Sequence, residues 1–327
     1  MDQFSAHLDR GWDLVQRGDS AGAELSARRA LEMDNQSPEA YNLLGYVAAL
    51  QGEFEEAAEH YRTAISLDDT YFEAMLNAAE ICIHPLGDIT EALDLCDQAL
   101  DLAESDDERI DALLLKFDAL LSSADSEAAK RLCNTFPDGP YENPMHSFLV
   151  ARALYEIGDA ERAVPLIEAA VKSGPPNPEA WYYLGLIRDD RGDTTAATQA
   201  FLCSRQLDLE IPPPPWTLTR ETFEETVRQA VAALPADVGQ FLRKDEEYVS
   251  DVPGVEVVAD GVDPRALLLL DGLVARPGEK PSARVIVYQR NVERLAGSVD
   301  SVAAEIVAAL RRELTASFID APPPVSD

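Results

Sequence analysis

Residues 37–69 read SPEAYNLLGYVAALQGEFEEAAEHYRTAISLDD, and this segment predicts two helices joined by a short turn. Ser37 is a good N-cap residue, Pro38 suits the first helical position, and Glu39 stabilises the positive end of the helix dipole. Gly52 ends the first helix, and apolar and small side chains then recur with the helical period at Phe54, Ala57, Ala58, Tyr61, Ala64 and Ile65. Such a pair leaves apolar faces open at both ends and therefore needs stacked neighbours.

Further helix pairs that could stack on this one recur at a period of 34 residues. Shifting back by that step maps small residues onto small residues, namely Gly45, Gly52, Ala57 and Ala64 onto Gly11, Gly18, Ala23 and Ala30. The same step relates Gly158 and Ala163 to Gly192 and Ala197. Helix-start signals recur as Asn143-Pro144 and Asn177-Pro178. A fixed period of this length predicts an array of stacked helix pairs.

This pattern resembles the tetratricopeptide repeat family. The residues that carry the resemblance are small and aromatic: Tyr41, Leu44, Gly45, Ala57, Tyr61 and Ala64, and later Trp181, Leu184, Gly185, Ala197 and Phe201. The resemblance implies an all-α superhelix. It also implies that the first helix of each pair lines a concave groove.

Six helix pairs are expected in residues 1–210, at 4–35, 38–69, 72–103, 107–134, 144–175 and 178–209. The third pair carries one extra residue at its turn, and the fourth is degenerate because it lacks the glycine turn. Four consecutive prolines then predict a stiff polyproline II spacer of roughly 12 Å within a linker at 211–218. A second domain is expected at 219–320, followed by a disordered tail at 321–327.

Carrying the family's groove positions over gives a candidate binding surface for a partner segment. Its residues are Trp12, Asn42, Tyr46, Arg152, Tyr155 and Tyr182, and the carried-over positions also include Leu76, Glu80 and Asp189. Some family members grip a terminal carboxylate with groove lysines and arginines, whereas only Arg152 is basic here. An aromatic and acidic groove better suits an extended or helical segment with basic and apolar side chains. Each of these residues has an alternative interpretation as a packing residue or as part of a solvated face.

The chain carries a formal net charge of −33, and residues 1–218 hold 41 acidic against 15 basic side chains. Such a surface repels phosphate backbones and anionic lipid, so neither nucleic acid nor a membrane is the expected partner. A basic protein partner fits this charge, and high solubility is the alternative reason for it. The sequence leaves the oligomeric state open.

The four cysteines Cys82, Cys96, Cys133 and Cys203 lie at expected helix positions without metal-binding spacing. This usage predicts buried, reduced thiols. The longest apolar run is far too short to span a bilayer. Together these features predict a cytoplasmic protein.

Mixed signals replace the period of 34 after residue 219. Residues 223–234 predict an amphipathic helix capped by Thr222, and residues 299–317 predict a closing helix. Its expected buried side chains are Val302, Ile306, Ala309, Leu310 and Leu314. β-branched runs at 255–259 and 284–288 predict strands, and a further strand within 265–273 is ambiguous. The expected architecture is a small α+β domain.

The order of these elements resembles a minimal zincin-like metallopeptidase family found in bacteria. The matching stretches are 232–235, 255–258, 269–272, 284–288 and 291–294. In that family the last helix carries a His-Glu-x-x-His motif, whose histidines bind zinc and whose glutamate polarises a bound water. Aligning the helix places Arg312, Glu313 and Ala316 on the motif, so both histidine positions are lost.

Residues 205–327 contain neither His nor Cys. The resemblance therefore implies a degenerate domain that binds no metal or cofactor and is not an enzyme. Two roles for Arg312 stay open: its charge fills the place of the lost zinc near Glu313, or it faces solvent beside Arg311.

The sequence thus favours a cytoplasmic bacterial adaptor or scaffold, in which the repeat groove binds a protein segment and the last domain is a pseudo-metallopeptidase. Two alternatives remain. One is an active zinc-dependent peptidase whose ligands come from elsewhere. The other is a chaperone-like assembly factor that shields basic clients.

Overall fold

The computed structural model describes residues 3–272 and 281–320, and the chain forms two compact units that divide after Gly174. The tail at 321–327 that the sequence predicts to be disordered lies outside the described residues. No helix in the described part of the chain combines the length and apolar character needed to cross a membrane.

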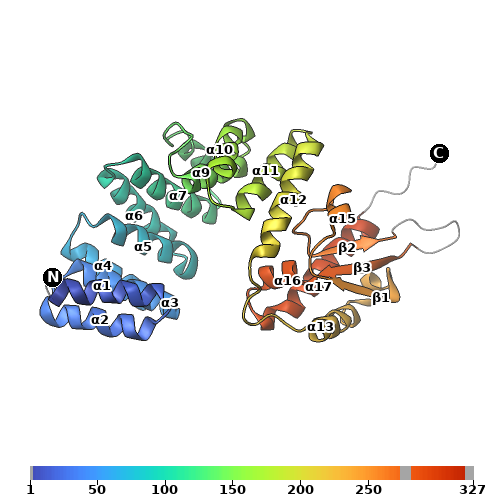
Figure 1. Ribbon diagram of the computed structural model, residues 1–327, viewed down its shortest axis with the longest axis horizontal. Coiled ribbons are helices and arrows are strands. Elements are labelled where there is room, and N and C mark those ends of the chain that lie inside the picture. The colour runs from blue at the N-terminus through green and yellow to red at the C-terminus, as the bar shows by residue number, and fades with distance from the viewer. Residues whose placement is uncertain (1–2, 273–280, 321–327) are drawn as a thin grey trace. The chain divides into compact units, whose positions relative to one another are not determined.

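The first unit is built of antiparallel helix pairs, drawn from blue to green in Figure 1. Its helices are α1 (Gln3–Gln16), α2 (Ser20–Met33), α3 (Pro38–Gln51), α4 (Phe54–Leu67), α5 (Phe72–Ile81), α6 (Ile89–Leu102), α7 (Asp106–Ser122), α8 (Ser126–Leu132), α9 (Pro144–Glu156) and α10 (Ala160–Ser173). The first helices of successive pairs, α1, α3, α5, α7 and α9, contact one another in a row. This stacking covers the apolar faces that a single pair leaves open.

The predicted start and stop signals of residues 37–69 are confirmed. The Ser37 hydroxyl accepts a hydrogen bond from the Ala40 backbone N–H, and Gly52 ends α3 with a left-handed φ of 80°. Gly45 faces the ring of Tyr61, where an added Cβ atom would lie 2.6 Å from the ring. The glycine therefore sets how closely α3 and α4 pack.

Two pairs depart from the regular repeat. In the third pair, the extra residue is absorbed by a π-helical turn at Cys82–Leu86, which ends at Gly87. In the fourth pair, Ala124 takes the left-handed turn position with φ 59°, the place that Gly158 takes in the next pair. The fourth pair thus keeps the turn geometry without the residue type that favours it.

The second unit joins a last helix pair to a small mixed sheet. Its elements are α11 (Pro178–Asp190), α12 (Thr194–Glu210), α13 (Arg220–Ala232), α14 (Ala236–Gly239), β1 (Leu242–Ser250), α15 (Val255–Ala259), β2 (Leu268–Asp271), β3 (Ala283–Tyr288), α16 (Gln289–Ala296) and α17 (Val302–Leu314). The strand order is β1-β3-β2, with β3 parallel to β1 and antiparallel to β2.

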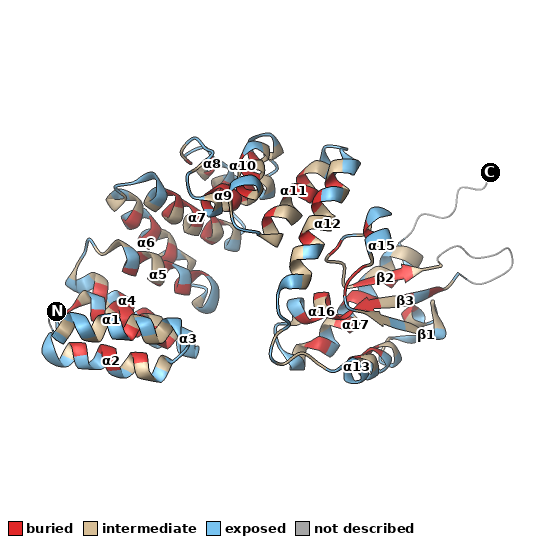
Figure 2. Cartoon of the chain, viewed as in Figure 1, coloured by how far each residue is buried: buried red, intermediate tan, exposed pale blue. Residues whose placement is uncertain are grey.

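One apolar core holds the sheet and its helices together, coloured red in Figure 2. The five side chains predicted to be buried on the closing helix are all buried, namely Val302, Ile306, Ala309, Leu310 and Leu314. They pack with Phe223 and Val227 of α13 and with alternate residues of β3. Trp216 from the proline-rich segment packs against the same core.

Three sequence predictions for this region were wrong in detail. Residues Val255–Ala259 form the short helix α15 rather than a strand, because backbone bonds such as Val258 N–H to Gly254 C=O close a helical turn. The N-cap of α13 is Thr219 rather than Thr222. Strand β1 was missed, because it is a charged edge strand with a register shift and a left-handed Asp245. Strand β3 was predicted correctly, and β2 lies within the ambiguous stretch.

The last helix pair is tied to the C-terminal elements by partly buried polar contacts. The Arg265 guanidinium donates to Asp208 on α12 and to Glu179 on α11. Arg205 on α12 donates to the Pro253 carbonyl oxygen at 2.6 Å. The compact unit therefore begins at residue 175, before the linker at 211–218.

Candidate protein-binding groove

A hollow of about 330 Å³ lies in the row of first helices of the first unit. It is lined from three helices: Leu76, Asn77 and Glu80 of α5, Asp111, Leu114, Leu115 and Asp118 of α7, and Leu149 and Arg152 of α9. Leucines form its apolar wall, and charged groups project from all three helices. We call this hollow the groove pocket.

Carboxylates outnumber cations around the groove pocket. Glu80, Asp111 and Asp118 line it, against the single guanidinium of Arg152. The Arg152 Nη2 atom lies 3.8 Å from Asp118 Oδ1, and its Nε atom lies 3.6 Å from Glu156 Oε1. Both distances are ion-pair contacts that are too long for good hydrogen bonds. Accordingly, Arg152 Nε is buried without a hydrogen-bond partner.

Burial raises the pKa of Asp118 above its ordinary value of 3.8, while the charges of Arg152 and His84 partly offset that effect. The ionised carboxylate is therefore partly desolvated in the groove pocket. A cation from a partner would stabilise it.

A second carboxylate of the groove pocket is held by a histidine. The buried His146 ring contacts Asp111 Oδ1 through Nε2 at 2.9 Å and Asp107 Oδ1 through Nδ1 at 3.0 Å. These contacts join α9 to α7 across the break after the fourth helix pair. His146 thus has a structural role beside the groove pocket.

The structure brings three of the carried-over groove positions, Leu76, Glu80 and Arg152, into the groove pocket. Asn42 is 2% exposed, and its side chain bonds Tyr71 and Asn77, the latter a residue of the groove pocket. Trp12 and Tyr46 stack edge to face with ring centroids 5.3 Å apart, joining the first two helix pairs. Tyr155 lies on α9, one helical turn beyond Arg152.

Tyr182 has a different environment, because it belongs to the second unit. Its hydroxyl donates to Asp263 Oδ2 at 2.7 Å, and the Arg265 guanidinium lies 4.3 Å from its ring centroid. Burial and the hydrogen bond to Asp263 raise the pKa of Tyr182. The C-terminal elements therefore occupy this face of Tyr182.

Sequence reasoning missed the contribution of α7 to the groove pocket, because the fourth helix pair looked degenerate. The period itself carries the signal: a step of 34 residues back from Arg152 lands on Asp118. Both residues line the same hollow.

The residues that the resemblance to zincins aligned with the zinc motif lie on the surface of the second unit. Arg312 Nε donates to Glu313 Oε1 at 3.1 Å, and the two side chains are 65% and 42% exposed. Ala316 is exposed in the π-helical turn at Thr315–Ile319 that follows α17. Arg312 thus faces solvent as well as pairing with Glu313, and exposed pairs of this kind contribute little stability.

Within residues 3–272 and 281–320, no group of three or more His, Cys, Asp or Glu side chains has an arrangement that could hold a metal ion. Three of the four cysteines are buried, and Cys203 is partly buried. Burial raises the pKa of Cys82 to about 11 and of Cys96 to about 12. Such thiols are unreactive at neutral pH.

Comparisons with known proteins agree with the repeat assignment. Residues 8–72 and 148–202 match the family model of the tetratricopeptide repeat. A curated relative, superkiller complex protein 3 of Mus musculus, is 23% identical over 265 residues, which are 78% of this chain and 16% of that protein. The chain therefore spans about one sixth of the length of that relative.

Two solved structures share the fold. PilF of Pseudomonas aeruginosa has a TM-score of 0.53 and 20% identity, covering 63% of this chain and 91% of that one. PilW, described as a type IV pilus biogenesis factor, has a TM-score of 0.50 and 16% identity, covering 61% and 90%. The chain thus contains tetratricopeptide repeats, a fold that generally mediates protein–protein interaction. These similarities give no support to a zincin-like C-terminal domain.

Proposed function

We propose that the first unit binds a segment of a partner protein along its row of first helices, and that the protein acts as an adaptor or scaffold. The observation that carries this proposal is the groove pocket, a hollow with leucine walls and excess carboxylates on three successive first helices. Repeat proteins use such extended surfaces for binding. Trp12, Tyr46 and Tyr155 extend the surface with aromatic side chains, which often dominate binding energy.

The partner segment carries basic and apolar side chains. A lysine or arginine placed beside Glu80 and Asp118 compensates their charge, the Asp118 carboxylate being partly desolvated, and apolar side chains fit the leucines. The cytoplasmic location and the exclusion of nucleic acid and membranes remain predictions from composition.

Selection from a random peptide library displayed on phage tests this proposal with the full chain. We expect the selected peptides to be enriched in Lys and Arg next to apolar residues. The double variant Glu80→Gln/Asp118→Asn should lose that enrichment. A matched control, Glu59→Gln/Asp94→Asn, removes two exposed carboxylates from second helices and should keep it. Equal selection by all three proteins would place the binding surface elsewhere.

Aromatic groove residues are tested separately. Replacing Tyr46 and Tyr155 together by Ala should weaken a selected peptide by about 1–4 kcal/mol while the helix content stays unchanged. Unchanged affinity would remove both tyrosines from the binding surface. Tyr182→Ala is the contrasting variant. It should leave the affinity for the peptide unchanged, because Asp263 and Arg265 already cover that ring.

The chaperone-like alternative predicts a different partner profile. An adaptor retains a small set of partners through the groove pocket, whereas an assembly factor captures many unfolded basic clients. Affinity purification of the native protein and of the Glu80→Gln/Asp118→Asn variant, followed by mass spectrometry, distinguishes the two.

We further propose that the C-terminal domain is a pseudo-metallopeptidase that neither binds zinc nor cleaves peptides. The support is chemical: the aligned histidine positions are Arg312 and Ala316, and residues 205–327 offer no His or Cys ligand. Structural and catalytic zinc sites usually need at least three protein ligands. The alternative of an active peptidase requires ligands from elsewhere.

Metal content of the purified protein and cleavage of an unfolded substrate with added zinc test this second proposal. Stoichiometric zinc, or proteolysis that disappears in Glu313→Gln, would overturn it. Replacing Arg312 and Ala316 together by His tests the resemblance itself, because a correct alignment should give a weak zinc affinity that rests on the two histidine ligands.

A further inference from the structure

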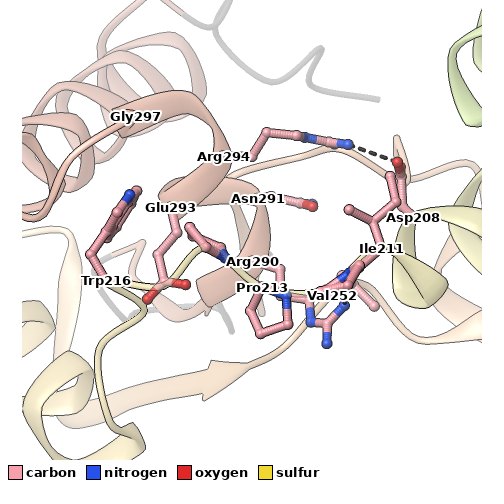
Figure 3. A pocket seen from close by; sticks show the side chains of 12 residues that line it. Asp208, Ile211, Pro213, Trp216, Val252, Arg290, Asn291, Glu293, Arg294 and Gly297 are labelled. Carbon is pink, nitrogen blue, oxygen red and sulfur yellow. Dashed lines mark hydrogen bonds and ion pairs between the residues drawn. The ribbon is translucent and has the colours of Figure 1, made fainter. Parts of the chain in front are cut away.

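The second unit has an open cavity of about 340 Å³ between the proline-rich segment and helix α16. Figure 3 shows the side chains around it, which come from α12, the segment at 211–216, the loop after β1 and α16. We call it the linker cavity. Its size falls in the lower part of the range of small-molecule sites, about 300–1,000 Å³.

Apolar side chains form most of the linker cavity wall. They are Ile211, Pro212, Pro213, Pro214, Trp216 and Val252. Proline backbones have a restricted φ, and Trp216 is held by packing against the core of the unit. The wall is therefore largely formed before any ligand arrives, which lowers the entropic cost of binding.

Glu293 is the one acidic residue of the linker cavity without a cationic partner among the described residues. Its side chain is 1% exposed, and its Oε1 atom accepts from the Leu218 backbone N–H at 3.0 Å and from Gln289 Nε2 at 2.9 Å. No described group donates to its second oxygen, Oε2. Oε2 is not sealed from solvent, and as part of the cavity lining it can accept a charge-assisted hydrogen bond from a bound cation.

The other charged groups of the linker cavity are already engaged. Arg294 Nη1 donates to Asp208 Oδ1 at 2.8 Å, and Asp208 also pairs with Arg265. Arg290 Nη1 donates to the carbonyl oxygens of Leu209 and Ile211 at 3.1 and 3.3 Å, at the negative end of α12. Because the Arg290 contacts are to neutral carbonyl oxygens, the lining as a whole carries two carboxylates and two guanidinium groups, and Glu293 is the carboxylate without an ion pair.

We propose that the linker cavity binds a small organic amine with a flat apolar body. Its protonated ammonium donates to Glu293 Oε2, and its body lies against Trp216 and the prolines. A divalent metal ion does not fit, because a single carboxylate supplies too few ligands. This site is separate from the groove pocket and from the degenerate motif at Arg312 and Glu313.

Isothermal titration of the full chain with 2-phenylethylamine tests the site, with 2-phenylethanol as the neutral analogue of the same shape. We expect the amine to bind with a dissociation constant on the order of 1 mM or below. The alcohol should bind at least about tenfold more weakly, because it lacks the charge-assisted hydrogen bond.

Glu293→Gln keeps an oxygen acceptor for Leu218 but removes the charge, so it should abolish the preference for the amine. Glu221→Gln, an exposed change on α13, is the matched control and should leave the preference intact. Ile211→Trp should fill the cavity and block both probes. This second variant keeps the site testable even if Glu293→Gln does not fold normally. Equal affinity for amine and alcohol, an amine preference that persists in Glu293→Gln, unchanged binding in Ile211→Trp, or no binding at 10 mM would each overturn the proposal.

Discussion

Ala124 shows how a single residue departs from its repeat without changing the fold. It takes a left-handed φ of 59°, and the equivalent Gly158 has φ 86°. The left-handed conformation costs an L-residue about 1–2 kcal/mol, a cost that glycine escapes. Among the turns of the repeats, this backbone strain therefore lies in the degenerate fourth pair.

Replacing Ala124 by Gly should stabilise the first unit. Part of the gain is lost because glycine is more flexible in the unfolded chain, which leaves about 0.5–1 kcal/mol. The reverse change, Gly158→Ala, should destabilise by a similar amount, since no neighbour lies within 4 Å of its added Cβ atom. Urea unfolding followed by circular dichroism measures both. A loss of stability in Ala124→Gly would contradict the assigned turn conformation.

Asp118 carries a predicted conflict between stability and binding. Burial raises its pKa in the folded state above the ordinary 3.8, so the folded state holds a proton more tightly than the unfolded state does. Its contribution to stability is then greatest below pH 3.8 and is lost as the pH rises through the raised value. At neutral pH the ionised carboxylate therefore lowers the stability of the folded state.

Asp118→Asn should therefore raise the melting temperature of the full chain at pH 7, and the gain should shrink as the pH falls towards 4. Thermal melts across that pH range measure the effect. The exposed Asp94→Asn on α6 is the control, and we expect little change from it. A lower melting temperature for Asp118→Asn at pH 7 would show that its pairing with Arg152 outweighs its burial.

At the scale of elements, close helix contacts depend on a glycine facing an aromatic ring. Gly45 on α3 meets Tyr61 on α4, and Gly185 on α11 meets Phe201 on α12, where an added Cβ atom would lie 2.4 Å from the ring. The same device thus operates in both compact units. The buried Tyr61 ring cannot move without disturbing the core, because interiors are closely packed, whereas the Phe201 ring is partly exposed.

Gly45→Ala should cost about 1–3 kcal/mol through overpacking, although alanine is the better helix former. Gly185→Ala should do the same in the second unit. Unfolding midpoints of the two variants and of the Gly45→Ala/Tyr61→Leu double variant measure this, since a smaller residue at 61 should rescue the first change. A neutral or stabilising effect of Gly45→Ala would show that α3 and α4 can separate freely.

At the scale of the whole molecule, repulsion between its acidic side chains lowers the stability of the first unit. Residues 1–174 hold 35 acidic and 12 basic side chains. Most of the ion pairs found there are exposed, such as Arg17 with Asp13 and Lys130 with Glu127, and exposed pairs contribute little. Net repulsion of this kind destabilises a compact state.

The melting temperature of the first unit should therefore rise when NaCl is increased from about 10 mM to 0.5 M. The reason is that salt screens exposed charges beyond roughly 10 Å at 0.1 M. Calorimetry of the full chain across a salt series measures this. KCl should act like NaCl if screening is the cause. A flat or falling midpoint would mean that the acidic side chains are already compensated locally.

The repeats could be predicted from sequence because their signals are local. The cap at Ser37, the turn at Gly52 and the small residue at Gly45 each act within one helix pair, and the period of 34 repeats them. The closing helix of the second unit was predictable for the same reason, since its buried residues follow the helical period.

The parts that sequence reasoning missed depend on contacts between distant segments. Strand β1 has little apolar patterning and is a strand because it pairs with β3, about 40 residues later. The groove pocket needs Glu80, Asp118 and Arg152 on three stacked helices, and the linker cavity needs the prolines to lie against Glu293. Local propensity settles where a helix starts and ends, because each backbone bond closes within four residues. Which charges become buried without a partner is set only by tertiary packing, since desolvation depends on everything that surrounds a group.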